Sequence, residues 1–230
     1  MLLLLCSGGG RTPWNTWVSC EEVEFDGQIY QVDPFGERKA EVMTLGSDGG
    51  RWESFAYDVR NKEEPHFFAT EDHNKGTVRR FTPKEPDWDN DPWMMLHGEG
   101  TVDYLMISPN VTNNGGTFIW TDDEEAAKNN ARSFYPQTEG IDVHSNEMFF
   151  VCKNMRQIFV LDLDHGTYWN ATTVNGMFDG KSWKWLNECR SSIPLCRLYS
   201  MFLILMSFEH RQTGSNDSYP RRCQRDPILH

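Results

Sequence analysis

A cysteine followed directly by two glutamates is the stretch of this chain best suited to chemistry. Cys20, Glu21 and Glu22 place a soft thiolate donor beside two hard carboxylate donors. This mixed set suits a transition metal with a hard cation nearby. The alternative interpretation is a buried structural cysteine followed by two solvated acids, because free cysteine is among the most buried residue types.

The residues before Cys20 predict the strand that positions it. Residues 14–18 read Trp-Asn-Thr-Trp-Val, and we expect this alternating run to end where Cys20 and the two acids reach a rim. Similar patterns predict further strands, and a helical composition predicts one short helix. The strands are expected at 28–36 with a closing turn, 51–58, 66–72, 76–81 and 117–120, and the helix at 122–132.

Three more acids lie at or near predicted strand ends. Glu53 follows a Gly-Gly turn, Asp72 comes directly after Glu71, and Glu139 precedes a glycine. Side chains of consecutive strand residues point to opposite faces, so Glu71 and Asp72 should separate, with Asp72 the better ligand candidate. The alternatives are an exposed strand-edge acid at Glu53 and a polar hairpin turn around Asp72.

A weak internal repeat indicates the architecture. The pattern of an entry strand, an aromatic strand and an exit strand recurs after about 80 residues, which fits two propeller blades of ~40 residues each. The matching segments are Asp58, Phe67-Phe68 and Arg80-Phe81 in the first copy and Asp142, Phe149-Phe150 and Ile158-Phe159 in the second.

Composition narrows the class of function. The chain has 230 residues, a net charge of -12 and nine tryptophans, which fits one domain of many short strands that binds cations. The acidic balance argues against nucleic acid and anionic membranes as partners. The six cysteines include no CxxC pair, so a zinc ribbon is not expected. We expect a monomer that takes a small-molecule substrate.

The two ends of the chain differ from its middle. Met1 is followed by four leucines without a basic flank, which is too short for an export signal or a membrane span. Acids predominate up to about residue 180 and bases beyond it. We therefore expect a folded region over 7–180 and a divergent or disordered tail over 181–230.

The segment from Gly9 to Glu22, Gly-Gly-Arg-Thr-Pro-Trp-Asn-Thr-Trp-Val-Ser-Cys-Glu-Glu, resembles the signature of the PhoX-type alkaline phosphatases. Asn15 stands where that signature has glycine. The resemblance extends over roughly 7–180 and implies an all-β, incomplete propeller of about four blades. It also implies an iron and calcium site that hydrolyses phosphate esters, in an extracellular or periplasmic protein. The chain is then a truncated or divergent member.

The same resemblance implies roles for individual residues. Cys20 corresponds to an iron ligand, and at least one of Glu21 and Glu22 serves calcium or supports the site. Glu53, Asp72 and Glu139 correspond to metal ligands around the central channel on which the strands of a propeller converge. Gln137 stands where catalytic members carry an arginine that clamps phosphate, and a neutral amide cannot provide that charge.

Three functions remain open at this stage. The first is a metal-dependent phosphoric monoester hydrolase that uses iron and calcium. The second is a non-catalytic, calcium-binding propeller that acts as an interaction scaffold, which Gln137 favours. The third is a hydrolase of lactones or other esters with calcium alone, against which Cys20 argues, because calcium prefers oxygen ligands.

Overall fold

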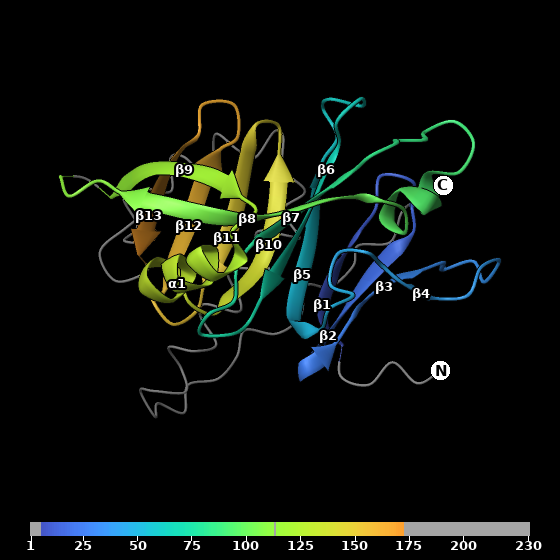
Figure 1. Cartoon of the computed structure of the whole chain (residues 1–230), viewed down its shortest axis with the longest axis horizontal. Coiled ribbons are helices and arrows are strands. Elements are labelled where there is room, and N and C mark those ends of the chain that lie inside the picture. Colours follow the sequence, from blue (N-terminus) through green and yellow to red (C-terminus); the bar gives the residue numbers. More distant parts are fainter. Residues whose placement is uncertain (1–5, 113, 173–230) are drawn as a thin grey trace, which may run out of the picture.

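The computed structural model describes residues 6–112 and 114–172, which form antiparallel strands almost throughout (Figure 1). Within these residues one α-helix, α1 (Glu124–Phe134), and one 3-10 helix, η1 (Pro92–Leu96), interrupt the strands. The strands are β1 (Cys6–Arg11), β2 (Trp17–Gly27), β3 (Ile29–Val32), β4 (Glu41–Val42), β5 (Gly50–Asp58), β6 (His66–Glu71), β7 (Arg79–Pro83), β8 (Gly100–Pro109), β9 (Gly115–Thr121), β10 (Thr138–His144), β11 (Glu147–Cys152), β12 (Gln157–Asp162) and β13 (Thr167–Thr172).

The described strands form three four-stranded antiparallel meanders. These are β1–β4, β5–β8 and β10–β13, and β9 pairs with both β8 and β13. The described strands confirm the all-β class. A meander of four strands is also the size of one propeller blade. From a spacing of ~40 residues per blade we expected about four blades. The described residues form three meanders, because β9 and α1 occupy the connection between the second and the third. The expected boundary at 180 and the segment 181–230 lie outside the described residues.

The internal repeat corresponds to equivalent strands of two meanders. Its first copy falls on β5, β6 and β7, and its second copy on β10, β11 and β12. In each copy the aromatic pair lies in the second strand, where Phe68 and Phe150 are buried. Burial of the same positions explains why aromatic residues recur there.

Strand β2 differs from the expectation at its end. We expected a strand that finishes at Cys20 and the two acids, but β2 continues to Gly27. Its first half pairs with β3, and its second half turns to pair with β5 through Glu22 and Gly27. Glu21 and Glu22 therefore lie inside a strand that joins two meanders, because β5 pairs with the part of β2 beyond Cys20.

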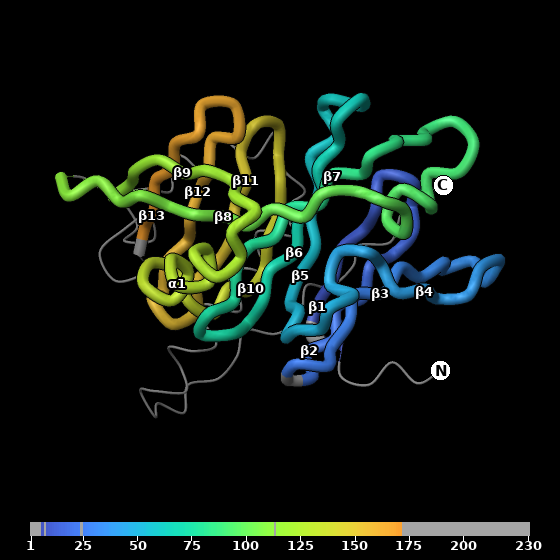
Figure 2. Tube along the Cα trace, in the orientation of Figure 1, coloured from blue at the N-terminus to red at the C-terminus, as the bar shows by residue number. Residues whose placement is uncertain are grey.

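Apolar side chains fill the space on both sides of the central strands. One cluster lies between β5, β8 and β11 and includes Phe68, Tyr135 and Phe150. Another lies between β2, β5 and β6 and includes Trp52. Helix α1, expected from the sequence, covers one face, where Asn130 exchanges two hydrogen bonds with the Ile107 backbone. Figure 2 shows β5, β6 and β10 running side by side between these regions.

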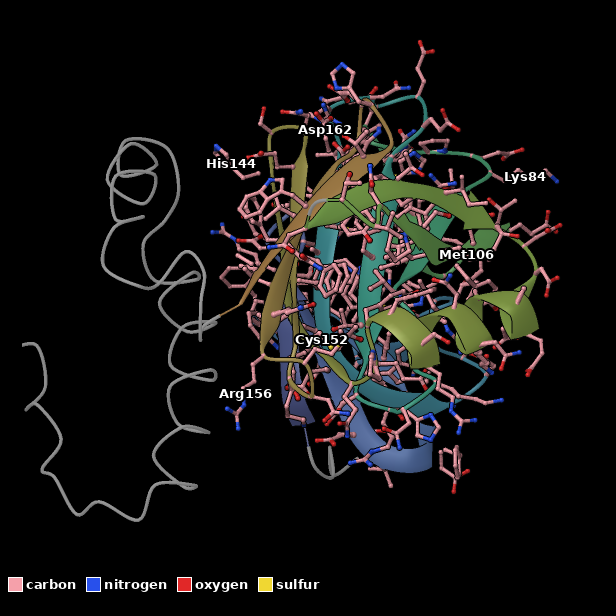
Figure 3. The ribbon with its side chains drawn as sticks, turned by 90° about the vertical axis from the view of Figure 1, so that its left-hand side faces the viewer. Lys84, Met106, His144, Cys152, Arg156 and Asp162 are labelled. Atoms are coloured by element: carbon pink, nitrogen blue, oxygen red, sulfur yellow. The ribbon has the colours of Figure 1, made fainter. Side chains whose placement is uncertain are left out.

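The sheet has two ends with different side chains. In Figure 3 the labelled His144 and Asp162 lie at one end, and Cys152 and Arg156 lie at the other. Strand β10 starts at the end where β11 finishes, so Thr138 and Cys152 are paired neighbours there.

In the part of the chain that the structure describes, no helix is long and apolar enough to cross a membrane.

Candidate metal centre

A glycine-rich strand fixes the position of Glu53. A Cβ atom at Gly8 would lie 2.0 Å from the Glu53 carbonyl oxygen, and one at Gly10 would lie 2.3 Å from the Phe55 carbonyl oxygen. Only glycine permits β1 to lie this close to β5. The β5–β6 ladder is irregular between Trp52 and Ser54. Such a bulge redirects side chains, and here Glu53 is the residue in the irregular position.

Reciprocal hydrogen bonds from two buried threonines position Glu139. The hydroxyl of Thr70 donates to the Glu139 carbonyl oxygen over 2.6 Å. The hydroxyl of Thr138 donates to the Glu71 carbonyl oxygen over 3.0 Å and accepts from the Glu71 N–H. These bonds attach the start of β10 to the end of β6, so Glu139 is brought beside the second meander.

The two acids after Cys20 point to opposite faces of β2. Glu22 pairs with the Arg51 guanidinium, whereas Glu21 accepts a hydrogen bond from the Gln28 N–H at the β2–β3 connection. This separation follows from the alternation of side chains along a strand. The structure thus brings Glu22 to the candidate centre and leaves Glu21 at the hairpin.

Lys153 joins two of the expected ligand residues. Its ammonium lies 2.6 Å from Asp72 Oδ2 and also pairs with Glu139 Oε1. The side chains of Asp72 and Glu139 are 6% and 7% exposed, and that of Lys153 is 24% exposed. The other oxygen of Asp72, Oδ1, is buried without a hydrogen-bond partner. A buried carboxylate oxygen without a partner is costly, so this atom is positioned to accept a further ligand.

The charges of these residues act on one another. Burial, and after it the nearby carboxylates of Glu139, Glu22 and Asp72, together raise the pKa of Glu53 to about 8, while Lys153 opposes them. Burial also raises the pKa of Glu139. Carboxylates that share a small region disfavour one another's ionisation. We call the four acids, which come from all three meanders, the acidic centre: Glu22, Glu53, Asp72 and Glu139.

Cys20 lies beside the acidic centre on the same face of β2 as Glu22. Its side chain is fully buried, and burial, followed by the charge of Glu53, raises the pKa of its thiol far above the usual range. The thiol is therefore protonated without a metal. A bound metal ion would have to hold it as the thiolate.

The donor chemistry of the acidic centre fits a hard cation. Four carboxylates supply oxygen ligands of the kind that calcium takes, and Asp72 Oδ1 has no competing hydrogen bond. Their arrangement is not a finished cage, because no group of three or more His, Cys, Asp or Glu side chains within residues 6–112 and 114–172 is close enough to hold a metal ion. The fit therefore lies in donor type and unpartnered oxygen, and binding requires the carboxylates to close around the ion.

Sequence reasoning singled out the acids and missed the two bases among them. Lys153 and Arg51 both pair with acids of the centre. The signal for Lys153 was the internal repeat, since β6 and β11 are equivalent strands and Asp72 and Lys153 each follow directly after them. Arg51 gave no local signal, because its partner Glu22 lies on a distant strand.

The turn before β2 places Asn15 in a backbone conformation that glycine adopts readily. Asn15 has a left-handed φ of 70°, and its N–H donates to the Thr12 carbonyl oxygen. Asparagine is one of the non-glycine residues most often found in this conformation. The turn that leads into β2 is therefore compatible with either residue.

No protein-family model matches this chain, and no curated protein sequence matches it. Among solved structures the chain is similar to Pseudomonas fluorescens PhoX in complex with vanadate, a transition state analogue, with a TM-score of 0.53 and 14% sequence identity. The similarity covers 70% of this chain and 46% of that one, so the chain spans less than half of the PhoX chain. The three meanders and this likeness together establish a PhoX-like β-propeller fold.

Proposed function

We propose that the acidic centre is a cation site and that the protein is a metal-dependent phosphoric monoester hydrolase related to PhoX. The observation that carries the proposal is that four acids from three meanders lie near enough to affect one another's charge, and that one of them has a buried, unpartnered oxygen, Asp72 Oδ1. Acidic residues rarely stay buried together unless a cation compensates them. The PhoX-like fold supports the assignment to phosphate ester hydrolysis.

Each group of the centre has a proposed part. Glu22, Glu53, Asp72 and Glu139 would hold calcium, and Cys20 would supply a thiolate to iron. Bound cations would neutralise charge and act as Lewis acids toward the phosphoryl oxygens. Arg51 and Lys153, which are partly exposed, provide the positive side chains that would contact the phosphate group of a small-molecule ester.

Metal content and activity of the purified full chain test this proposal. We expect calcium and iron to bind in stoichiometric amounts, hydrolysis of p-nitrophenyl phosphate, and loss of iron in Cys20→Ala. Cys152→Ala is the matched control, because Cys152 is also a buried free thiol but donates to the Pro136 carbonyl oxygen. A folded protein that binds neither metal would refute the proposal.

A second function is favoured by the surroundings of Gln137. This residue brings no charge, and its N–H and carbonyl oxygen bond to the His73 carbonyl oxygen and the Lys153 N–H. A centre without an arginine at this place is suited to holding calcium without turning over phosphate. Calcium binding with neither iron nor hydrolysis would therefore identify a non-catalytic propeller that serves as an interaction scaffold.

A further inference from the structure

Two acids of the acidic centre, Glu53 and Glu139, occupy equivalent positions of the second and third meanders. Trp52 pairs with Glu71 in the second meander, and Thr138 pairs with Cys152 in the third. Both ladders then shift register directly after these pairs. Glu53 and Glu139 are therefore equivalent, each at the bulge of its inner strand.

The residues at the next pair of equivalent positions, Asp72 and Lys153, carry opposite charges. Asp72 follows the last residue of β6, and Lys153 follows the last residue of β11. The second meander therefore contributes two acids, and the third contributes one acid and one base. The base of one repeat pairs with the acid of the other, through the contact between Lys153 and Asp72.

The backbone holds Lys153 in place while its side chain keeps a route to solvent. Its N–H donates to the Gln137 carbonyl oxygen over 3.1 Å, and its carbonyl oxygen accepts from the Arg156 N–H over 3.1 Å. Its side chain is about a quarter exposed, although both carboxylates that it pairs with are nearly buried. A lysine has a flexible stem of four methylene groups, so its ammonium can leave these carboxylates without a change in the fold.

We propose that Lys153 is a built-in competitor for the cation of the acidic centre. Its ammonium occupies the place between Asp72 and Glu139 in the metal-free protein and must move toward solvent when a cation binds. This inference rests on the proposed cation site and adds its regulation. The ammonium lowers the affinity for metal and stabilises the empty centre, because buried carboxylates without a counter-ion would repel one another.

Replacement of Lys153 by methionine tests the competition. Lys153→Met keeps most of the apolar stem and removes the charge. We expect affinity for Tb³⁺ and Ca²⁺, measured by terbium luminescence and calorimetry on the full chain, to rise by about ten-fold or more. In chelator, the same variant should melt at a lower temperature than wild type, and calcium should raise its melting temperature by a larger increment than it does for wild type.

Two more variants keep the test decisive. Lys153→Arg retains the charge and should bind the ions no more tightly than wild type. Lys84→Met removes an exposed lysine that pairs with Glu99 and should change neither affinity nor melting. If Lys153→Met is too unstable in chelator, it is refolded with calcium present and its affinity measured by competition with a fluorescent chelator.

The outcomes separate this inference from the proposed function. Equal or weaker binding in Lys153→Met, with normal binding in wild type, would overturn the competition and leave the cation site standing. Absence of binding in wild type and in every variant would overturn both.

Discussion

Glu71 and Asp72 are neighbours in the sequence, yet their side chains enter two buried clusters with opposite arrangements of charge. Asp72 enters the acidic centre, where Asp72 and Glu139 are nearly buried and the bases Lys153 and Arg51 are partly exposed. Glu71 faces a cluster around Arg79, in which the guanidinium is 4% exposed and its partner Asp48 is 54% exposed. The buried charge is thus negative in the first cluster and mainly positive in the second.

The charge of Arg79 is compensated within the chain, although Arg79 Nε and Glu71 Oε2 are buried without hydrogen-bond partners. Arg79 donates to both oxygens of Asp48 over 2.8 Å and lies over the rings of Trp52 and Tyr104, with its guanidinium carbon 4.6 and 5.3 Å from their centroids. Burial raises the pKa of Glu71, and Arg79 opposes that change. A buried cation with these partners needs no external ion, which indicates a structural role. The acidic centre holds four acids and two bases, and this excess of acids is one basis of the proposed cation site.

The largest effect is expected from breaking the compensated cluster. Arg79→Met should lower the free energy of unfolding by about 3–5 kcal/mol, because it leaves Glu71 buried without its base and removes the contacts with both rings. Urea denaturation of the full chain measures this change. A loss below about 1 kcal/mol would show that Arg79 behaves as a surface charge.

The pH dependence of stability should come from the acidic centre. The folded-state pKa of Glu53, about 8, exceeds its ordinary value of 4.5, so between these values the folded state keeps a proton that the unfolded state has lost. The contribution of Glu53 to the free energy of unfolding is therefore fully present below about pH 4.5 and is lost as the pH rises through 8. Urea midpoints at several pH values in chelator measure this fall, to which Glu139 contributes in the same direction.

Glu53→Gln sharpens the comparison, because its expected change in the free energy of unfolding is opposite in sign to that of Arg79→Met. Removing one of four repelling carboxylates should stabilise the metal-free protein by about 1 kcal/mol near pH 8 and flatten the pH dependence. The same variant should lose the stabilisation that calcium gives to wild type. Thermal melting with chelator and with calcium distinguishes the two effects. A destabilised metal-free variant would mean that the Glu53 carboxylate is a structural partner.

The smallest effect is expected at an exposed pair outside both clusters. Lys84 and Glu99 are 66% and 82% exposed and lie 2.9 Å apart. Exposed pairs contribute about 0–1 kcal/mol, so Glu99→Gln should leave the urea midpoint nearly unchanged and should not alter calcium binding. A clear loss of either would mean that the effects of the other variants reflect general charge rather than position.

Local pattern was sufficient for much of this molecule. Sequence patterns predicted the strands at β3, β5, β6, β7 and β9, and a helical composition over 122–132 predicted helix α1. In the structure its N-cap, Asp123, accepts a hydrogen bond from the Ala126 N–H. Strand β8 was not predicted, because its pattern around Tyr104 and Leu105 alternates only over part of its length. The separation of Glu71 from Asp72 also followed from alternation alone, because a strand has a side-chain period of two.

Sequence by itself thus determined the all-β class, the repeat and the acids that were candidates for a site. Tertiary structure alone decided that Glu22 rather than Glu21 joins them, that Lys153 stands between Asp72 and Glu139, and that Arg51 pairs with Glu22. The physical reason is that convergence depends on strand register and bulges between distant segments. One extra residue in a strand reverses the faces of all that follow, and no local pattern records it.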